Sequence, residues 1–567
     1  MGTTRRRLAW IAAVLVAAGV PGRASAQFEG VSATLAPPPE QYAISPGGVD
    51  LRTGRFAHGE TDLSIGGDGS AGLTLTRLMT SSLAGHIDPL GNLSHNWDIT
   101  LVEKRVDLQS GNYNNGAGID YWISVNYGGR SDAFKSPSTD TGFTQLSRSL
   151  YAGLTYSGAR SSGSVVYTYE SPDGTRVIFR PLGNDCSSVT RCSLPSRIVH
   201  ADGTSLTFEY ENPTPGVPNT TRLRSITSTR GYALLFEYSG SGIYWNAVSR
   251  TCALNLTLSG KPSNNLCPTD ASAVVNYDYT TYNGKAVLAS VTDAVGGTTT
   301  FGYSNLSGQP ASAGYVMTYT KPGQGAPWQT LYVGTGINND GGIEPVVGGQ
   351  LFADGSSYLY EFDSTPPVEG EIPSIAGGQY TDAVGNVTQV RYGFPRLPPT
   401  MNPSGPEHPL NVDDVFWQVT PGPVSIIDAL GRTTQFDYCD PNAMAGLPQW
   451  VRHRCLVTLL QSVTEPEGNK VTLGYSGRSI NRKTRIAKPG SGLANLQVTA
   501  TYTCTTNIKL CAKPVTVTDA KGFVTNYAYD ATHGGVLTET LPAATAGGVR
   551  PQKRYTYTQL YAWYKNS

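Results

Sequence analysis

This chain of 567 residues carries little charge, and that charge is balanced. Charged residues make up 15% of the sequence, and Lys plus Arg equals Asp plus Glu at 42 each. A chain without net charge has no electrostatic attraction for nucleic acid or anionic membranes, so we expect no nucleic-acid partner. Methionine is scarce at five residues, whereas tyrosine reaches 32. Because aromatic residues favour strands, the composition predicts an all-β protein.

Long apolar runs are absent after residue 26, so we expect no membrane span in the mature chain. Before that point, three arginines at 5–7 precede an apolar run at 8–20, and a small-x-small site (ASA) follows at 24–26. The run is too short to span a bilayer, which takes about 20 residues. The pattern predicts a signal peptide over 1–26, cleaved before Gln27. We therefore expect export through the inner membrane to the periplasm, the cell surface or the medium.

Motifs that carry catalysis are also lacking. None of the seven histidines belongs to an H-x-x-x-H, H-E-x-x-H or Cys/His cluster, and no G-x-S-x-G elbow is present. We expect no enzyme activity, no catalytic residue, no metal site and no cofactor. The acidic residues Asp413, Asp414, Glu369 and Glu371 leave a glycoside hydrolase with a carboxylate pair as a less favoured alternative.

The eight cysteines fall into four pairs of near neighbours, each within one loop between strand-like segments. Oxidising compartments allow such thiols to form disulfides, although sequence alone does not determine the connectivity. Zinc is disfavoured because none of the pairs has C-x-x-C spacing. We predict local disulfides for Cys186/Cys192, Cys252/Cys267, Cys439/Cys455 and Cys504/Cys511.

Self-comparison of the chain finds five segments that align without gaps. In each segment an acidic residue leads, a glycine follows three positions later and a tyrosine seven positions after that. The segments are TDAVGGTTTFGY at 292–303, TDAVGNVTQVRY at 381–392, IDALGRTTQFDY at 427–438, TEPEGNKVTLGY at 464–475 and TDAKGFVTNYAY at 518–529. The repeat residues are Asp293, Gly296, Tyr303, Asp382, Gly385, Tyr392, Asp428, Gly431, Tyr438, Glu465, Gly468, Tyr475, Asp519, Gly522 and Tyr529.

Each repeat has the chemistry of a β-hairpin. The acidic side chain can accept hydrogen bonds from backbone N–H groups two residues on, and glycine supplies the positive φ of the turn. After the turn the residues alternate, as at Thr299, Phe301 and Tyr303, which predicts a strand with one packed face. A metal site at the acidic residue would tolerate less change than Glu465 represents, so we interpret the motif as an architectural turn.

Spacing between the turn glycines is irregular, and insertions separate many repeats. Regular solenoids and propellers keep a tighter period, so the spacing favours a spiralling sheet. We predict an extended leader at 27–50, an N-terminal β entry region at 51–160 and a repeat region at 161–567.

The repeats resemble the YD repeats of the rearrangement-hotspot (Rhs) family. The turn DALGR at 428–432 and the segment YDATHGGVLT at 529–538 are similar to the family's Tyr-Asp-x-x-Gly-Arg-Leu unit. The segments TGRF at 53–56 and LTLTR at 73–77 resemble the strands that precede the first repeats in that family. The resemblance implies a large, spiralling β-sheet shell, or YD-repeat cocoon, built from irregular hairpins.

In that family the shell encloses a toxic C-terminal domain or acts in cell-surface adhesion and competition. The family's closing element, Asp-Pro-x-Gly, is not found in the C-terminal part of this chain, which ends at 561–567 in strand-like composition. We therefore expect a shell that is open or incomplete at its C-terminus, with a C-terminal effector domain of a longer chain as its partner. The alternative is an adhesin that binds cell-surface glycans through aromatic residues such as Trp245, Trp328 and Trp417.

Overall fold

The structure is a computed structural model, and it describes residues 44–51, 54–80, 95–97, 99–107, 119–128, 130–137, 142–145, 151–158, 165–187, 190–211, 221–306, 314–337, 343–364, 375–392, 423–438, 460–476, 478–503 and 507–563. Most of these residues lie in strands. The helical elements among them are α4 (Ile508–Cys511) and two 3-10 turns, η3 (Gly69–Ala71) and η5 (Gly242–Tyr244). None of the described helices has the length and hydropathy needed to cross a membrane.

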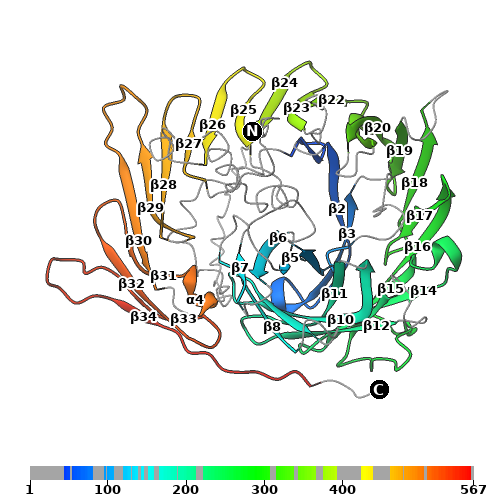
Figure 1. Ribbon diagram of the computed structural model, residues 1–567, viewed down its shortest axis with the longest axis horizontal. Coiled ribbons are helices and arrows are strands. Elements are labelled where there is room, and N and C mark those ends of the chain that lie inside the picture. Colours follow the sequence, from blue (N-terminus) through cyan, green and yellow to red (C-terminus); the bar gives the residue numbers. More distant parts are fainter. Residues whose placement is uncertain are drawn as a thin grey trace, which may run out of the picture.

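A single antiparallel sheet of 31 strands, β4 to β34, dominates the molecule (Figure 1). From β8 (Gly153–Ser157) onward, each strand pairs with the next strand along the chain. Within the described residues β34 (Gln552–Arg554) pairs only with β33 (Val536–Thr540), so strand pairing does not close the sheet into a barrel. The predicted all-β fold with one continuous curved sheet is confirmed.

The strands after β11 (Thr190–Val199) run in chain order around the curve. They are β12 (Ser205–Glu211), β13 (Arg222–Ser228), β14 (Tyr232–Tyr238), β15 (Val248–Asn255), β16 (Ala273–Tyr282), β17 (Lys285–Thr292), β18 (Thr298–Asn305), β19 (Gly314–Thr320), β20 (Trp328–Ile337), β21 (Ile343–Leu351), β22 (Ser357–Ser364), β23 (Ile375–Thr381), β24 (Val387–Tyr392), β25 (Pro423–Ile427), β26 (Thr433–Asp437), β27 (Ser462–Thr464), β28 (Lys470–Ser476), β29 (Ser479–Ile486), β30 (Leu496–Tyr502), β31 (Pro514–Thr518) and β32 (Val524–Tyr529).

The sheet divides at β11 (Thr190–Val199). The first part of β11 pairs with β4 (Thr100–Asp107), and its last part pairs with β12. The branch that begins at β4 continues through β5 (Ile119–Tyr127), β6 (Arg130–Pro137) and β7 (Thr144–Gln145). It packs on the branch of β8, β9 (Val166–Glu170) and β10 (Arg176–Ser187), where the rings of Phe134 and Tyr169 lie 6.3 Å apart.

A small three-stranded sheet lies inside the curve of the large one (Figure 1). Its strands are β1 (Val49–Asp50), β2 (Arg55–Ile65) and β3 (Leu73–Thr80). We call it the inner sheet. Its buried side chains, including Phe56 and Leu73, share one hydrophobic core with Phe236, Tyr332 and Val390 of the large sheet. The inner sheet therefore fills the concave side between β14 and β24.

Curvature of the large sheet has a repeated local cause. From β12 onward, register shifts such as those at Tyr238, Tyr475 and Tyr529 fall between strands that are not joined by a repeat turn, and none falls between two strands that a repeat turn joins. A β-bulge bends its strand and increases the local twist. Bulges that recur at the same step of most repeats bend the sheet in one direction, which coils it; the pairs β18–β19 and β26–β27 have no such shift.

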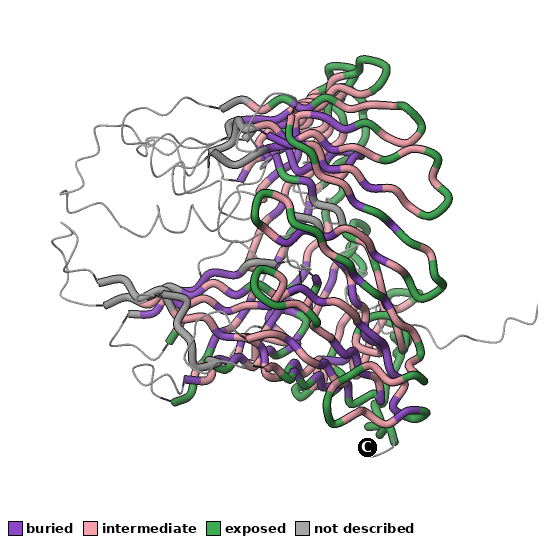
Figure 2. The backbone as a smooth tube through the Cα atoms, turned by 90° about the vertical axis from the view of Figure 1, so that its right-hand side faces the viewer, coloured by how far each residue is buried: buried purple, intermediate pink, exposed green. Residues whose placement is uncertain are grey.

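The two rims of the large sheet differ. Short turns with glycine at positive φ, such as those at Gly296, Gly385 and Gly522, connect the strands along one rim, which we call the turn rim. Strand alternation places the last residues of β12, β22, β24 and β26 on the opposite rim, which we call the loop rim. Figure 2 shows exposed residues gathered at the tips of the turn rim.

Candidate functional site: repeat hairpins and inner contacts

Carboxylates cap the turns of the repeats. Asp382 Oδ1 accepts hydrogen bonds from the backbone N–H groups of Val384 (3.0 Å) and Asn386 (2.9 Å). The same pair of bonds, two and four residues on, occurs at Asp293, Asp428 and Asp519. The hydrogen bond from the Asn386 side chain, helped by the backbone N–H groups, lowers the pKa of Asp382. These acids therefore act as turn caps.

Glu465 stands where the other repeats have aspartate. Its turn keeps the backbone pattern, since Glu465 N–H bonds to the Asn469 carbonyl at 2.9 Å and Gly468 N–H bonds to the Glu465 carbonyl at 2.9 Å. Gly468 has a φ of 84°, close to the 88° of Gly296 and the 86° of Gly522. The turn is therefore specified by the glycine and the backbone bonds, and the aspartate cap adds to them.

Replacing a turn glycine tests this assignment. Gly522 has a φ of 86°, and a Cβ added there meets no atom within 4 Å, so only backbone strain opposes the substitution. We expect Gly522→Ala to lower the free energy of unfolding by about 1–2 kcal/mol, the cost of the left-handed region for a residue with a Cβ. Gly325→Ala is the matched control, because that glycine is equally open but lacks positive φ. Urea denaturation of both variants measures the difference; equal effects would contradict the assignment.

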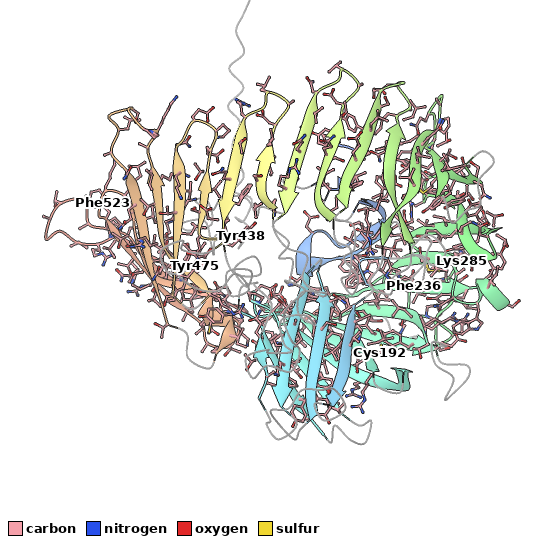
Figure 3. The ribbon with its side chains drawn as sticks, turned by 45° about the horizontal axis from the view of Figure 1, so that its top comes forward. Cys192, Phe236, Lys285, Tyr438, Tyr475 and Phe523 are labelled. Atoms are coloured by element: carbon pink, nitrogen blue, oxygen red, sulfur yellow. A yellow bond between two sulfur atoms is a disulfide. The ribbon has the colours of Figure 1, made fainter. Side chains whose placement is uncertain are left out.

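Tyrosine hydroxyls fasten the other end of the hairpins. The hydroxyls of Tyr438, Tyr475 and Tyr529 each donate to a backbone carbonyl 15 residues earlier, on Pro423, Leu460 and Pro514 respectively. Tyr210 and Tyr238 make the same bond to Pro195 and Leu223. Tyr502 and Tyr557 bond similarly to Ile480 and Val536. We call these bonds the tyrosine clasps, and Figure 3 labels two of them, Tyr438 and Tyr475.

The clasps predict a loss of stability in alkali. Burial raises the pKa of Tyr502 to about 12 and raises those of Tyr475 and Tyr529 as well. A folded-state pKa above the ordinary value of about 10 means that the folded protein holds the proton more tightly than the unfolded chain. Stability from these groups is therefore complete below about pH 10 and is lost as pH rises through the folded-state pKa. Urea melts with tyrosinate absorbance should show this fall, and Tyr502→Phe should reduce it.

Alternation along the repeat strands has the predicted period. Thr299 and Phe301 are 8% and 9% exposed, whereas Thr298 and Thr300, the neighbours of Thr299, are exposed. Phe436 and Tyr438 are also buried. The partner strands contribute Val291 opposite Thr299 and Val517 opposite Thr525. Tyr303 packs on the ring of Tyr282 at 5.7 Å, whereas the side chain of Tyr392 lies outside the described residues. The large sheet, which we call the wall, thus has an apolar inner face.

Charged groups attach the inner sheet to the wall. Arg77 on β3 contacts Asp62 (Nε to Oδ2, 3.2 Å) and Glu60 (Nη2 to Oε2, 2.7 Å) on β2. The side chains of Arg77 and Asp62 are each only 4% exposed. From the wall, Tyr277 donates its hydroxyl to Asp62 at 2.8 Å, and Lys321 pairs with Glu60 at 2.9 Å. We call these five residues the inner ion cluster.

The geometry of β2 brings these carboxylates together. Glu60 lies directly opposite Arg77 in the strand register, and a register shift follows between Thr61 and Leu63. The extra residue at this bulge is Asp62, whose side chain reaches the same guanidinium as Glu60. Burial raises the pKa of Asp62, and the charge and hydrogen bonds of Arg77 offset only part of that effect. The cluster is therefore costly to bury and depends on complete pairing.

The disulfide between Cys252 and Cys267 joins β15 to the loop that follows it. Both cysteines belong to a second hydrophobic cluster, with Ala233, Leu235 and Leu254. The alternate residues Leu234 and Phe236 point to the inner core, so this loop covers the outer face of β14 and β15. Cys192 and Cys511 are also disulfide-bonded. The side chains of Cys186, Cys439, Cys455 and Cys504 lie outside the described residues.

Of the residues considered for the alternative functions, the structure describes Trp245 and Trp328, which lie in different places. The acidic residues Asp413, Asp414, Glu369 and Glu371, together with Trp417, lie outside the described residues. Trp245 packs on the guanidinium of Arg222, whose Cζ lies 4.4 Å from the centroid of the indole ring. Trp328 lies elsewhere, between Phe56 and Tyr319. In the described part of the chain no group of three or more His, Cys, Asp or Glu side chains is placed to hold a metal ion.

Sequence reasoning did not identify the inner ion cluster. The signal was present in β3, where Leu73, Leu75 and Arg77 share one face and Arg77 is 3% exposed. A charged residue in register with buried leucines indicates a buried ion pair. Its carboxylate partner Asp62 was hidden by the bulge, and Tyr277 lies 215 residues away from it.

No family model matches this chain, and no curated protein matches it. Among solved structures it is similar to a chain of the TcdB2-TccC3-Cdc42 crystal structure, with 14% identity over 80% of this chain and a TM-score of 0.32. TcdB2-TccC3 without its hypervariable C-terminal region shows 11% identity over 92% and a TM-score of 0.30. This chain spans 24% and 44% of those two chains.

A third neighbour is the N-terminal domain of the effector protein SpvB from Salmonella typhimurium strain LT2. It shows 11% identity over 57% of this chain and 99% of that domain, with a TM-score of 0.18. TM-scores of this size do not establish a shared architecture, so the fold of this chain rests on its own strand registers.

Proposed function

We propose that this protein is an exported structural shell that contains or displays an effector, or that acts in contacts at the cell surface. The observation that carries the proposal is the single antiparallel sheet that coils without dividing into separate domains. A wall of this kind needs a repeated, self-supporting unit. The carboxylate-capped turn and the tyrosine clasp supply it, because they fasten both ends of a hairpin.

The inner sheet limits where contents could lie. Between β14 and β24 the concave side is already filled by β1–β3, which share its core. Among the described residues, the wall from β25 to β32 contributes only Ile426, on β25, to the packing around that core. We propose that this part of the wall, reached from the loop rim, is the region that faces an effector.

Protection from protease tests the proposal. The chain from Gln27 would carry an unstructured reporter peptide in the connection between β24 and β25, which leaves the loop rim, and the same reporter inserted at Gly385 of the turn rim would serve as the control. We expect the loop-rim reporter to be cleaved at least tenfold more slowly than the control. Equal cleavage rates would overturn containment, and the export component is tested separately by sequencing the N-terminus of the secreted protein, which should begin at Gln27.

A glycan-binding function has less support. Trp245 and Trp328 lie in different environments, and each is packed against other side chains. Stacking on a sugar needs an exposed ring face. We therefore do not propose the adhesin.

A further inference from the structure

Two distant parts of the chain meet across the opening of the coil. The backbone N–H of Arg478, between β28 and β29, donates to the hydroxyl of Tyr151 at 3.0 Å, across 327 residues. The guanidinium of the same arginine donates through Nη2 to the Gln145 carbonyl at 3.0 Å. We call this contact, together with the neighbouring contacts of α4, the seam. Figure 1 shows α4 beside β7 and β8.

Glycines on the β8–β10 side allow α4 to approach closely. A Cβ added to Gly153 would lie 2.1 Å from Cδ1 of Ile508, and one added to Gly174 would lie 2.8 Å from Cγ of Lys509. Gly174 belongs to the turn rim, whereas α4 follows β30 on the loop rim. The two ends of the coil are thus offset along the strand direction, as in a spiral.

Residues of opposite charge lie on the two sides of the seam, although the carboxylate side also carries Arg176 opposite Glu170 in the strand register. Arg478, Lys509 and Lys513 lie on the side of β28–β31 and α4, and Asp132, Glu170 and Asp173 lie on the side of β6–β10. Burial raises the pKa of Glu170, and the charges of Lys509 and Arg176 partly offset this. Burial lowers the pKa of Arg478, and the charge of Asp132 opposes this change. Burial also lowers the pKa of Lys513 to about 8, and the charge of Asp173 opposes that change. The ammonium groups of Lys509 and Lys513 bond to the carbonyls of Thr532 and Gly534 on their own side, so the carboxylates act on them across the seam through charge.

Strand pairing does not cross the seam in the described residues. β8 pairs with β9 and β34 pairs with β33, so neither strand bonds to the other end of the sheet. Opening the seam therefore breaks side-chain contacts and leaves every described backbone ladder intact. By contrast, parting any two strands of the wall would break a row of backbone hydrogen bonds.

We propose that the seam is an electrostatic latch, which opens and recloses the coil between β8–β10 and β28–β31 and so controls access to the concave side. The closure is a property of the coil itself, and only its use for loading or releasing contents rests on the proposed function. Charge pairs at such a latch weaken as salt screens them, because the screening length falls from about 30 Å at 0.01 M to about 3 Å at 1 M ionic strength.

Salt-dependent small-angle scattering of the folded chain tests the latch. We expect the maximum dimension of the protein to increase between low and high salt. Lys509→Glu should give the larger dimension already at low salt, and adding Glu170→Lys should restore the compact form. Lys521→Glu makes the same change of charge in a turn away from the seam and should scatter as the unmodified protein does. A dimension independent of salt and of Lys509→Glu would overturn the latch.

A crosslink across the seam provides the second measurement. The short approach between Gly153 and Ile508 suits a disulfide in the double variant Gly153→Cys, Ile508→Cys. We expect it to form without denaturant and to abolish the response to salt, with reduction restoring the response. A crosslink that does not form, or a response that persists once it has formed, would count against the proposal.

The two proposals fail separately. A reporter that is cleaved freely while scattering still switches with salt would remove containment and leave the latch. A protected reporter with scattering independent of salt would remove the latch and leave containment. Lys509→Gln is a milder variant if Lys509→Glu does not fold, and it should lower the salt concentration at which the coil opens.

Discussion

Replacing Asp62 with alanine is expected to lower the free energy of unfolding by about 1.5–3 kcal/mol, the range for losing hydrogen bonds to a charged group, because Arg77 keeps its second carboxylate. The reason lies in the inner ion cluster. Arg77 has 4% of its side chain exposed, and Asp62 accepts hydrogen bonds from both Arg77 and Tyr277. Without Asp62, Arg77 keeps only Glu60, and the inner sheet loses its bond to β16. Urea denaturation measures the stability, and hydrogen exchange in β2 and β3 should rise.

A compensating pair separates the charge effect from packing. The double variant Asp62→Leu, Arg77→Met removes both buried charges and keeps apolar volume, so we expect it to regain most of the stability lost by Asp62→Ala. Asp428→Ala is the surface control, since that carboxylate pairs with Arg432 at an exposed turn. A loss for Asp62→Ala no larger than that for the control would show that the cluster does not hold the inner sheet.

Phe236→Ala is expected to cost about 3–5 kcal/mol, the range for removing a fully buried aromatic side chain. Phe236 on β14 is 0% exposed and packs on His95, with ring centroids 5.5 Å apart. The substitution leaves a cavity between the wall and the segment that follows the inner sheet. Thermal and urea denaturation should both record the loss. Because leucine fills part of the cavity, Phe236→Leu should lose less stability than Phe236→Ala.

Phe523→Ala is the matched control for this prediction. Phe523 follows a repeat turn and is 50% exposed, and Figure 3 shows it at the outer edge of the sheet, away from Phe236. We expect a change within about 0.5 kcal/mol, as is usual for surface positions. Similar losses at the two positions would mean that the inner core does not dominate the stability of the coil.

The repeat hairpin was predictable because its contacts are local. The turn bonds of Asp382 span two and four residues, and the clasp of Tyr529 spans 15. A pattern of Asp, Gly and Tyr at fixed spacing encodes these bonds directly. The clasp partner was less visible, because a backbone carbonyl leaves no signature in the residue types.

The inner sheet was predicted as an entry region of short strands, without its position inside the coil. Its alternating leucines specify one buried face but do not specify which surface covers that face. The complementary surface is assembled from strands as distant as β16 and β24, so it exists only after the wall has coiled. The position of the inner sheet is therefore a property of the assembled fold.

By itself, the sequence determined that this protein is an all-β chain of hairpins with capped turns and alternating faces. Hydrogen bonds within single repeats suffice for that, because each repeat contains both partners. Only the tertiary structure decided that the sheet divides at β11, that β1–β3 occupy its concave side and that Arg478 meets Tyr151 across 327 residues. These outcomes depend on the sum of many small bends, which brings together surfaces that no local pattern of residues can specify.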